Sequence, residues 1–308
     1  MSAEPDPDRV LTRVRSATPA MVKRVLRPLA RRVGLAAPRQ WWDSSRSRSP
    51  HLGMRSRGAG AWCNICGWAG DGFEGVAHSE SARCPICGSI ARDRFLFWCF
   101  TSRTPLNRKL RVLETSPRLG HGYRTAMRRW FSYRSSDFDL GAHLADIALD
   151  LQQIDLPDNS IDVLLTPHVL EHVPDTRLAL SEIHRILSPG GRMYLQVPLL
   201  QGTTAPPLEP EFHADNTKVY WRFGWDLTTV LRDSGFAVRV LVPSEFAREL
   251  ERTTTDAADQ SGEFDLGSIR RDVVHADLEP VLTDRHARLL GTLPCHQFVV
   301  WECVRDAS

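Results

Sequence analysis

Apolar positions along the chain follow two spacings, and both become regular from about residue 110 onward. Short apolar runs, typical of buried strands, alternate with segments whose apolar residues recur at helical spacing. This alternation predicts an α/β protein with a doubly wound, mostly parallel sheet of seven strands. We expect strands at about 110–115, 132–137, 146–150, 161–166, 192–198, 236–242 and 296–303, and helices at about 91–103, 120–130, 170–187 and 224–234.

Departures from that alternation divide the chain into three parts. Residues 1–60 form a leader rich in Pro, Ser and Arg, residues 61–91 form a small cysteine-rich module, and residues 92–308 hold the sheet. Two insertions, 199–222 and 243–290, interrupt the sheet domain. Loops of that length are usually lids or binding loops, so we expect them to form a cap over a ligand.

The leader contains one segment with helical periodicity. Residues 20–34 place apolar side chains on one side of a helix and arginines on the other. Such a helix either rests on anionic lipid or docks on protein, and both interpretations stay open. No run approaches the 18 or so apolar residues that span a bilayer, and residues 1–10 lack the layout of a secretory signal. We expect a cytoplasmic protein, with peripheral contact at the inner membrane face as the open alternative.

Charge is distributed unevenly along the chain. Residues 1–60 hold 13 Lys and Arg against 4 Asp and Glu, whereas residues 61–308 hold 26 against 33. The globular part is therefore acidic, by 7 charges, and the leader is basic, by 9. A core that binds nucleic acid needs clustered positive charge to displace counterions, so we expect no nucleic-acid partner.

Four of the seven cysteines form a C-x2-C-x17-C-x2-C pattern, and each pair is followed by glycine. Four thiolates at this spacing can close a tetrahedron around Zn²⁺, which leaves no open position for catalysis. We therefore expect a structural zinc site; free thiols or a rubredoxin-like iron site are the alternatives. Cys99, Cys295 and Cys303 lie in apolar segments and are expected in the core. The predicted zinc ligands are Cys63, Cys66, Cys84 and Cys87.

Three phrases of the sequence carry a family resemblance: "IDLPDNSIDV" at 154–163, "LEHV" at 170–173 and "LSPGG" at 187–191. With them the chain resembles the class I S-adenosylmethionine-dependent methyltransferases, in particular the methyltransferase type 11 group. "CPICGSIARDRF" at 84–95 is similar to a zinc ribbon that precedes this domain in a bacterial subgroup. The resemblance implies a Rossmann-like sheet and S-adenosyl-L-methionine as cofactor.

The resemblance also implies roles for individual residues. The loop from Glu114 to Gly120 would hold the methionine end of the cofactor, Asp137 would accept from the ribose hydroxyls with Asp139 as the near alternative, and Asp150 and Leu151 would flank the adenine. The family's loop usually carries three glycines, whereas "ETSPRLG" keeps only Gly120 and includes Pro117, which has no amide hydrogen. Arg118 could pair with the ligand carboxylate instead. The predicted cofactor residues are Glu114, Ser116, Arg118, Gly120, Asp137, Asp150, Leu151 and Thr166.

A cluster of His168, Glu171 and His172 follows the fourth predicted strand, and His213 lies in the first insertion. "HVLEH" matches a zinc-protease pattern, but that pattern requires both histidines on one helix, and His168 ends a strand. Three interpretations stay open: a structural turn that starts the next helix, a catalytic site in which neutral His168 is a general base, and a divalent-ion site.

We expect an enzyme that transfers a methyl group to an oxygen atom. The resemblance favours a glycan or a glycosylated small molecule as acceptor, and an oligoglucoside such as a mycofactocin-type tail is a specific hypothesis. Trp221, Arg222 and Trp225 could offer a sugar or aromatic ring a flat surface, or could pack in the core. A catalytically silent binding protein, and an RNA or protein methyltransferase that docks its substrate on the zinc ribbon, are the alternatives.

Overall fold

The computed structural model of this chain describes residues 60–75, 82–213, 216–252, 265–292 and 299–306. Almost all of the leader, including the amphipathic segment 20–34, and Cys295 lie outside these residues, so the expectations about them remain predictions. Among the described residues, no helix has both the length and the apolar character needed to cross a bilayer.

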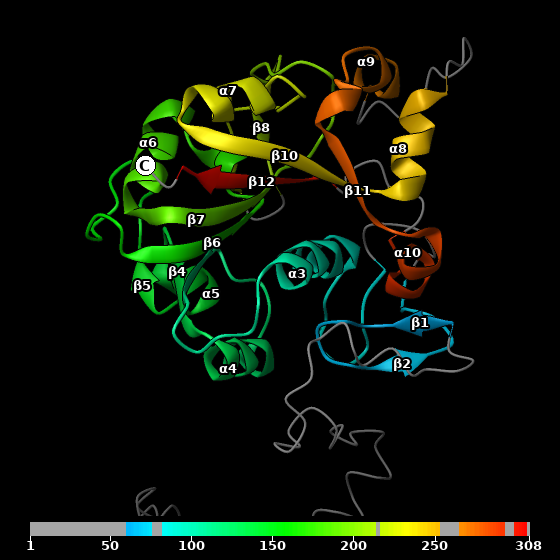
Figure 1. Cartoon of the computed structure of the whole chain (residues 1–308), viewed down its shortest axis with the longest axis horizontal. Coiled ribbons are helices and arrows are strands. Elements are labelled where there is room, and N and C mark those ends of the chain that lie inside the picture. Colours follow the sequence, from blue (N-terminus) through cyan, green and yellow to red (C-terminus); the bar gives the residue numbers. More distant parts are fainter. Residues whose placement is uncertain (1–59, 76–81, 214–215, 253–264, 293–298, 307–308) are drawn as a thin grey trace, which may run out of the picture. The chain divides into compact units, whose positions relative to one another are not determined.

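An eight-stranded sheet runs through the centre of the described residues (Figure 1). Its strand order is β11-β10-β12-β7-β6-β3-β4-β5. Strands β7, β6, β3, β4 and β5 are parallel to one another. Strand β12 is antiparallel to both β7 and β10, and β11 is parallel to β10. The strands are β3 (Arg111–Thr115), β4 (Ser132–Asp137), β5 (Ile147–Ala148), β6 (Ile161–Pro167), β7 (Leu187–Gln196), β10 (Phe236–Pro243), β11 (Leu278–Leu282) and β12 (Val300–Arg305).

This topology confirms the predicted fold class. From β3 the chain builds outward to β4 and β5 and then returns to add β6 on the other side of β3. The order of strands therefore reverses between β3 and β6. In doubly wound sheets, ligands bind at the carboxyl ends of the strands at such a reversal.

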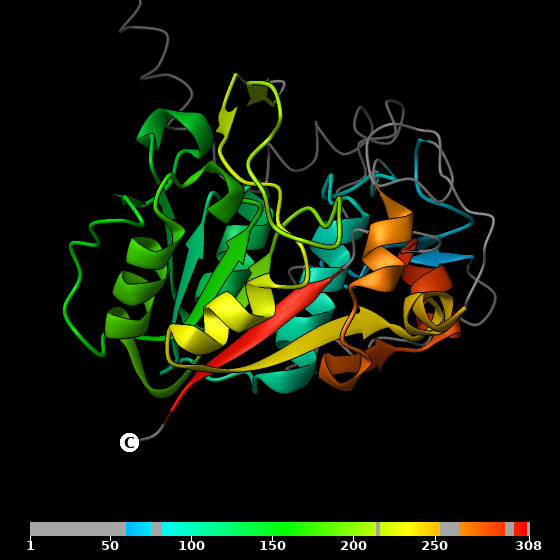
Figure 2. The ribbon, with the colours of Figure 1, turned by 90° about the horizontal axis from the view of Figure 1, so that it is seen from above.

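Helices cover both faces of the sheet (Figures 1 and 2). Along β7 and β12, neighbouring side chains point to opposite faces, as the period of a strand requires. Trp301 of β12 donates a hydrogen bond to Thr228 of α7, whereas the ring of Tyr194 in β7 packs on Phe100 of α3. The helices are α3 (Ala91–Arg103), α4 (His121–Trp130), α5 (Leu140–His143), α6 (Thr176–Ile186) and α7 (Leu227–Asp233).

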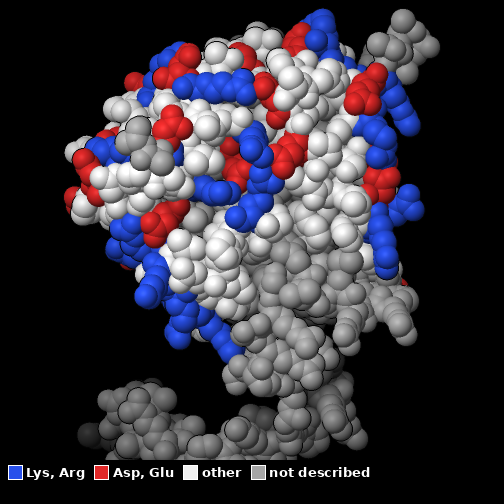
Figure 3. Space-filling model, viewed as in Figure 1, with Lys and Arg blue, Asp and Glu red and all other residues white. Residues whose placement is uncertain are grey.

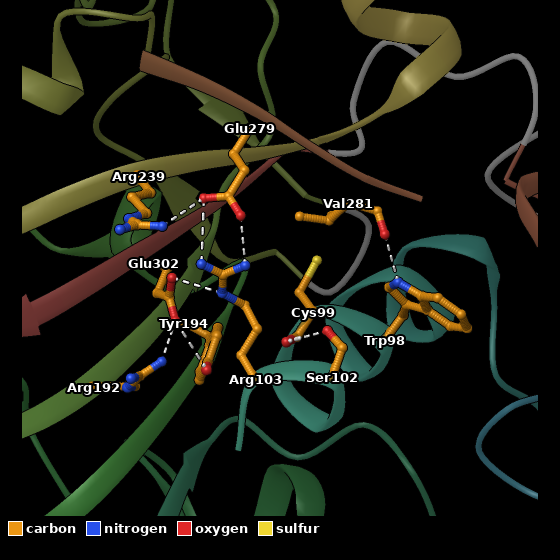
Figure 4. A network of polar contacts seen from close by, with 10 residues as sticks. All are labelled: Trp98, Cys99, Ser102, Arg103, Arg192, Tyr194, Arg239, Glu279, Val281 and Glu302. Atoms are coloured by element: carbon orange, nitrogen blue, oxygen red, sulfur yellow. Dashed lines mark hydrogen bonds and ion pairs between the residues drawn. The ribbon is translucent and has the colours of Figure 1, made fainter. Parts of the chain in front are cut away.

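The sheet has one strand more than the sequence predicted, because insertion 243–290 adds β11 beside β10. A network of charged side chains ties this strand to the rest of the sheet (Figure 4). Arg103, at the end of α3, donates to Glu279 of β11 at 2.8 Å and to Glu302 of β12 at 2.8 Å, and Arg239 of β10 also binds Glu279. The Glu302 side chain is 2% exposed, so these ion pairs compensate a carboxylate that would otherwise be costly to bury.

The two insertions contain further short elements. Insertion 199–222 forms a small antiparallel hairpin, and insertion 243–290 places three helices around β11. These elements are β8 (Glu211–Phe212), β9 (Lys218–Val219), α8 (Ser244–Glu251), α9 (Leu266–Arg271), the 3₁₀ turn η4 (His275–Asp277) and α10 (Asp284–Leu290).

The helix expected at 170–187 does not begin at residue 170. A 3₁₀ turn, η3 (Leu170–His172), comes first, and the α-helix α6 starts only at Thr176. Pro174 separates the two, and the carboxylate of Asp175 caps α6 by accepting from the amide of Leu178. The prediction that Glu171 and His172 open this helix is therefore wrong, and both residues belong to a separate turn.

Charged side chains of both signs are mixed over most of the coloured surface in Figure 3, and a line of basic side chains follows its lower left edge. On this face no broad region carries positive charge alone.

Candidate functional site

The four predicted zinc ligands lie together in the module that precedes α3. The Sγ atoms of Cys63, Cys66, Cys84 and Cys87 all lie within 4.8 Å of one another, with Cys63 to Cys87 at 3.6 Å and Cys66 to Cys84 at 3.5 Å. A tetrahedral ion with Zn–S bonds of 2.3 Å separates its sulfurs by about 3.8 Å. The donor set and its spacing therefore fit a structural zinc ion.

Both cysteine knuckles have the same backbone geometry. Gly67 and Gly88 follow the second cysteine of each pair with φ of 71° and 72°, the left-handed region that favours glycine. The amide of Gly67 donates to the carbonyl of Cys63 at 2.8 Å, and that of Gly88 to Cys84 at 2.9 Å. The Cys-Gly pairs noted in the sequence thus form two matching turns around the thiols.

Arg94 of α3 joins this module to the rest of the molecule, a contact that the sequence analysis missed. Its side chain is fully buried, and its guanidinium donates to the carbonyl oxygens of Ala82, Ser89 and Leu290, the last in α10. Near it, φ at Gly291 is 62°, and a Cβ there would lie 2.5 Å from the ring of Phe73. In the sequence Arg94 is one arginine among many, so only the structure reveals this role.

At the carboxyl end of β3, Glu114 points into the protein and not toward solvent. The hydroxyl of Tyr133 donates to its Oε2 at 2.6 Å. Burial raises the pKa of Glu114 to about 7, against the opposing effect of the hydrogen bonds from Tyr133 and Tyr123. Glu114 was predicted as a cofactor contact. Its buried side chain, bonded to Tyr133, instead suits a role in holding the start of the loop Glu114–Gly120 in place.

Ser116 takes the bend where the family's loop has its first glycine. Its φ is 46°, in the left-handed region, and its amide donates to the carbonyl of Ser136 at 2.8 Å. Next to it, Asp137 ends β4 with its carboxylate 10% exposed. His143 of α5 donates from Nδ1 to Asp137 at 2.8 Å and lies 3.4 Å from the Ser116 hydroxyl. Both contacts use the same ring nitrogen, so these three residues do not form a relay of the protease type.

The remaining residues of the loop have separate contacts. Pro117 is buried, and its carbonyl accepts from Arg124 of α4 at 3.0 Å. Arg118 extends toward α3, with Nη1 3.9 Å from Asp93 and its side chain 35% exposed. Gly120 precedes α4, and a Cβ there would meet nothing within 4 Å.

Two predicted adenine contacts follow β5. Leu151 is buried, and the Asp150 carboxylate accepts from the amide of Gln152 at 2.8 Å. We call the ends of β3 and β4, with Glu114–Gly120, Asp137 and His143, the β3–β4 edge. The neighbouring ends of β6 and β7, with Thr166, His168, η3 and Gln196, are the β6–β7 edge.

At the β6–β7 edge, His168 ends its strand in a left-handed conformation with φ of 51°. Its amide donates to the carbonyl of Gln196 at 2.7 Å, and Nδ1 lies 3.2 Å from Nη1 of Arg92 on α3. Burial, with the charges of Arg92 and Arg118, lowers the pKa of His168 well below its ordinary value, so the ring is neutral. Arg92 was not among the predicted site residues.

Glu171 lies between two histidines in the turn η3. Its Oε1 is 3.6 Å from His168 Nδ1 and 3.9 Å from His172 Nε2, and 2% of its side chain is exposed. Burial raises the pKa of Glu171 to about 8, so its carboxyl holds a proton at neutral pH. The ring of His172 packs edge-on against that of His213, with centroids 4.6 Å apart. The four predicted residues therefore come together, with exposed His213 at the outside.

Several buried polar atoms at this edge have no hydrogen-bond partner among the described residues. They are Oγ1 of Thr166, Nε2 of His168, both carboxyl oxygens of Glu171 and both side-chain heteroatoms of Gln196. Buried polar atoms are paired in most proteins, so a group of unpaired atoms in one place is typical of a site that binds water or a polar ligand. Gln196 was missed because a glutamine at the end of an apolar strand gives no sequence signal.

The structure gives no support to a divalent ion at this cluster. Within the described residues, only the four cysteines bring three or more candidate ligand atoms within 4.8 Å of one another. His168, Glu171 and His172 do not gather in this way, because the first two face each other and Nδ1 of His172 binds the carbonyl of Lys218 at 2.7 Å.

The aromatic residues of the first insertion separate into two environments. Trp225 is buried, donates from Nε1 to the carbonyl of Ile269 at 2.7 Å and packs near Trp301, so it belongs to the core. Trp221 is half-buried and donates to Pro174, and Arg222 binds Glu211 at 2.8 Å. The surface proposed from all three residues is therefore reduced to Trp221 and Arg222.

One segment of the chain matches a known protein family. Residues 125–195 match the family described as a methyltransferase domain. This segment of the chain is similar to a methyltransferase domain. The matched segment runs from α4 to the end of β7, and it includes Asp137 and the cluster from His168 to His172. The loop Glu114–Gly120 precedes it.

A curated relative matches part of this chain. It is an uncharacterized 37.1 kDa protein in transposon TN4556 of Streptomyces fradiae, 35% identical over 107 residues. Those residues are 30% of this chain and 29% of the relative, so the chain matches less than a third of that protein's length.

Solved structures that match this chain share little of its sequence. An S-adenosylmethionine-dependent methyltransferase from Mesorhizobium loti is 16% identical with a TM-score of 0.40, covering 70% of this chain and 98% of that one. Phosphoethanolamine N-methyltransferase 2 from Haemonchus contortus is 16% identical with a TM-score of 0.40, covering 71% and 53%. The [4+2]-cyclase SpnF is 16% identical with a TM-score of 0.41, covering 77% and 88%.

Proposed function

We propose that this chain is an S-adenosylmethionine-dependent methyltransferase that methylates an oxygen atom of a small-molecule acceptor. The observation that carries the proposal is the bend after β3, where Ser116 adopts the left-handed conformation that glycine usually supplies. The bend therefore exists without the family's glycines, and it lies beside Asp137 at the end of β4. This is the edge of a doubly wound sheet at which ligands bind.

The residues present suit such a cofactor. Asp137 would accept from the ribose hydroxyls, Asp150 and Leu151 would flank the adenine, and Arg118 would pair with the carboxylate of the methionine end. The buried, unpaired hydroxyl of Thr166 offers a further polar contact. When bound, S-adenosylmethionine supplies an electrophilic methyl group on a sulfonium.

Methylation of a hydroxyl requires that its proton be accepted, and Glu171 with His172 supports that role. The His172 ring donates from Nδ1 to the backbone carbonyl of Lys218, which can only accept. The neutral ring therefore keeps a lone pair on Nε2, 3.9 Å from Glu171 Oε1. Together the two groups can take up a proton in a buried site and pass it outward toward exposed His213.

For the acceptor we propose a glycan or a glycosylated small molecule, as the family resemblance suggests. A cavity of about 520 Å³ in the first insertion supports this class. Its lining mixes polar and charged side chains with prolines, which suits the polar and apolar faces of a sugar ring. Among the lining residues are Gln201, Glu209, Glu211, Arg222, Pro206 and Pro207.

Titration calorimetry with S-adenosylhomocysteine on the full, zinc-loaded chain tests the cofactor assignment. We expect binding, and we expect Asp137→Asn to weaken it by roughly 10- to 100-fold, the range for a lost hydrogen bond to a charged group. Asp139→Asn is the matched control, because Asp139 caps α5 by accepting from Gly141 and asparagine can keep that bond. Equal losses in both variants would contradict the role of Asp137.

A silent binding protein is the second candidate, and two contacts favour it. The carboxylate of Asp137 is already bound by His143, and Arg118 lies near Asp93. If the ligand cannot displace His143 from Asp137 and Asp93 from Arg118, calorimetry will show no binding of S-adenosylhomocysteine to the intact chain. Measurable binding removes this candidate.

A further inference from the structure

Helix α3 begins just after the second cysteine knuckle, and its first turn is bonded to both knuckles. Asn64, within the first knuckle, donates from Nδ2 to the carbonyl of Arg94 at 2.8 Å. Arg94 in turn donates to the carbonyl of Ser89 at 2.5 Å, and the Ser89 hydroxyl lies 3.2 Å from the sulfur of Cys87. Arg92 lies within the turn that these bonds hold.

Arg92 spans the distance from this turn to the end of β6. Its Nη1 lies 3.2 Å from Nδ1 of His168. A guanidinium can only donate, so Nδ1 of His168 accepts and carries no hydrogen. The hydrogen of the neutral ring is then on Nε2, which is buried and has no partner within the described part of the chain.

We propose that the four-cysteine module sets the role of His168: through α3 it places Arg92 so that His168 is held as the Nε2–H tautomer and donates that hydrogen to an oxygen of a bound ligand. Arg92 is thus a positioning residue, and His168 is a donor and not a general base. The ligand contact rests on the proposed methyltransferase function, whereas the tautomer does not.

The tautomer leaves His168 without a lone pair for a proton. Nδ1 is engaged by Arg92, and Nε2 already carries hydrogen. When a hydroxyl is methylated, an O–C bond forms, the S–C bond of the donor breaks, and the hydroxyl proton leaves. The carboxyl of Glu171 lies 3.6 Å from His168 and already holds a proton, so it can take the hydroxyl proton only as it passes its own to the lone pair on Nε2 of His172, 3.9 Å away.

Charged and titratable groups face His168 from four elements. Arg92 comes from α3 and Arg118 from the loop after β3, while Glu171 and His172 come from η3 and His213 follows β8. Arg92 donates a hydrogen bond to the ring, whereas Arg118 acts on it through its charge, so Arg118→Ala is a matched control that removes a charge and keeps that bond.

Ring-¹⁵N NMR of histidine-labelled, zinc-loaded protein tests the inference directly. The chain has 11 histidines, and the signals lost in His168→Gln identify the relevant ring. We expect His168 to show one neutral form, with hydrogen on Nε2, between pH 6 and 8. A wild-type ring with hydrogen on Nδ1, or a charged ring, overturns the proposal without any variant.

Variants then show whether the tautomer of His168 depends on Arg92 and the cysteine module or on nearby charge in general. Arg92→Ala should convert the single tautomer into a mixture, Arg92→Lys should preserve it by keeping a donor, and Arg118→Ala should leave it unchanged. Asn64→Ala, which frees the first knuckle from α3 without removing zinc, should also produce the mixture. An unchanged single tautomer in Asn64→Ala and Arg92→Ala would show that neither the module nor Arg92 sets it.

These readouts need neither cofactor nor acceptor, so they fail independently of the proposed function. To test the ligand contact, S-adenosylhomocysteine is added to the wild-type sample. A shift of the His168 Nε2 signal supports a contact with the cofactor side. If calorimetry shows binding but the Nε2 signal does not move, that contact is excluded while the tautomer stands.

Discussion

The β3–β4 edge and the β6–β7 edge lie side by side at the same end of the sheet, but they treat buried polar groups differently. At the β3–β4 edge, Tyr133 donates to Glu114 and His143 donates to Asp137. At the β6–β7 edge, Glu171, Thr166 and Gln196 have buried side-chain atoms without partners among the described residues. An unpaired buried polar group costs about 1–3 kcal/mol of folding free energy. A ligand that forms hydrogen bonds with these groups would therefore stabilise the β6–β7 edge. The difference indicates where a polar acceptor would bind.

The two buried glutamates provide the largest expected effect. Burial raises the pKa of Glu171 to about 8 and that of Glu114 to about 7, against 4.5 for an ordinary glutamate. The folded state is therefore favoured while each carboxyl keeps its proton. The free energy of unfolding should fall as the pH rises from about 4.5, and the loss should level off near pH 8 for Glu171 and near pH 7 for Glu114.

Replacing either glutamate by glutamine removes that loss, because the amide never ionises. We expect Glu171→Gln to be more stable than the wild type by a few kcal/mol at pH 9 and nearly equal to it near pH 5, measured by urea unfolding. Glu114→Gln should gain less, because Tyr133 already compensates the carboxylate. A larger gain in stability for Glu114→Gln than for Glu171→Gln would mean that the β3–β4 edge, and not the β6–β7 edge, holds the less well compensated carboxyl.

Much of the fold could be predicted from the sequence, because the apolar spacing of a parallel sheet is strong. The helices at 91–103 and 120–130 match α3 and α4 closely. Strand β11 was missed because its residues are only partly buried and Arg103 and Arg239 hold it through Glu279. The helix start at residue 170 was wrong because Pro174 and the cap at Asp175 outweigh the apolar period.

The candidate site was predictable only where a motif names its residues. The cysteine spacing and the sequence from His168 to His172 identified groups that do lie together. Arg92 and His143 could not be found in this way. Arg92 contacts His168, which lies far from it in the chain, and His143 reaches Asp137 from the short helix α5. Neither residue belongs to a sequence motif.

The bends that end β3 and β6 allow a smaller test. Ser116 and His168 both adopt left-handed backbone, which costs a non-glycine residue about 1–2 kcal/mol. We expect Ser116→Gly to raise the free energy of unfolding by about 0.5–1 kcal/mol and to leave the affinity for S-adenosylhomocysteine within twofold. Ser116→Val should destabilise, because a branched side chain fits this conformation poorly.

His168→Gly relieves the same backbone strain at the other edge but should be destabilising overall. Only 8% of the His168 side chain is exposed, so its removal leaves a cavity and also removes the acceptor of the hydrogen bond from Arg92. Chemical unfolding of the two glycine variants in parallel gives the comparison. Stabilisation by both would mean that the His168 side chain contributes nothing at its edge.

The smallest expected effect concerns His143, the group that now binds the carboxylate of Asp137. A ribose that bonds to Asp137 must compete with His143, whose side chain is 32% exposed. A hydrogen bond from a partly exposed side chain is worth about 1 kcal/mol, so His143→Ala should tighten S-adenosylhomocysteine binding by up to about fivefold. His121→Ala is the matched control, because His121 is an exposed histidine at the start of α4 whose ring contacts Thr125 and not Asp137. Weaker binding in His143→Ala would instead make His143 part of the cofactor site. At the β3–β4 edge His143 would then help to bind the ligand and would not compete with it for Asp137.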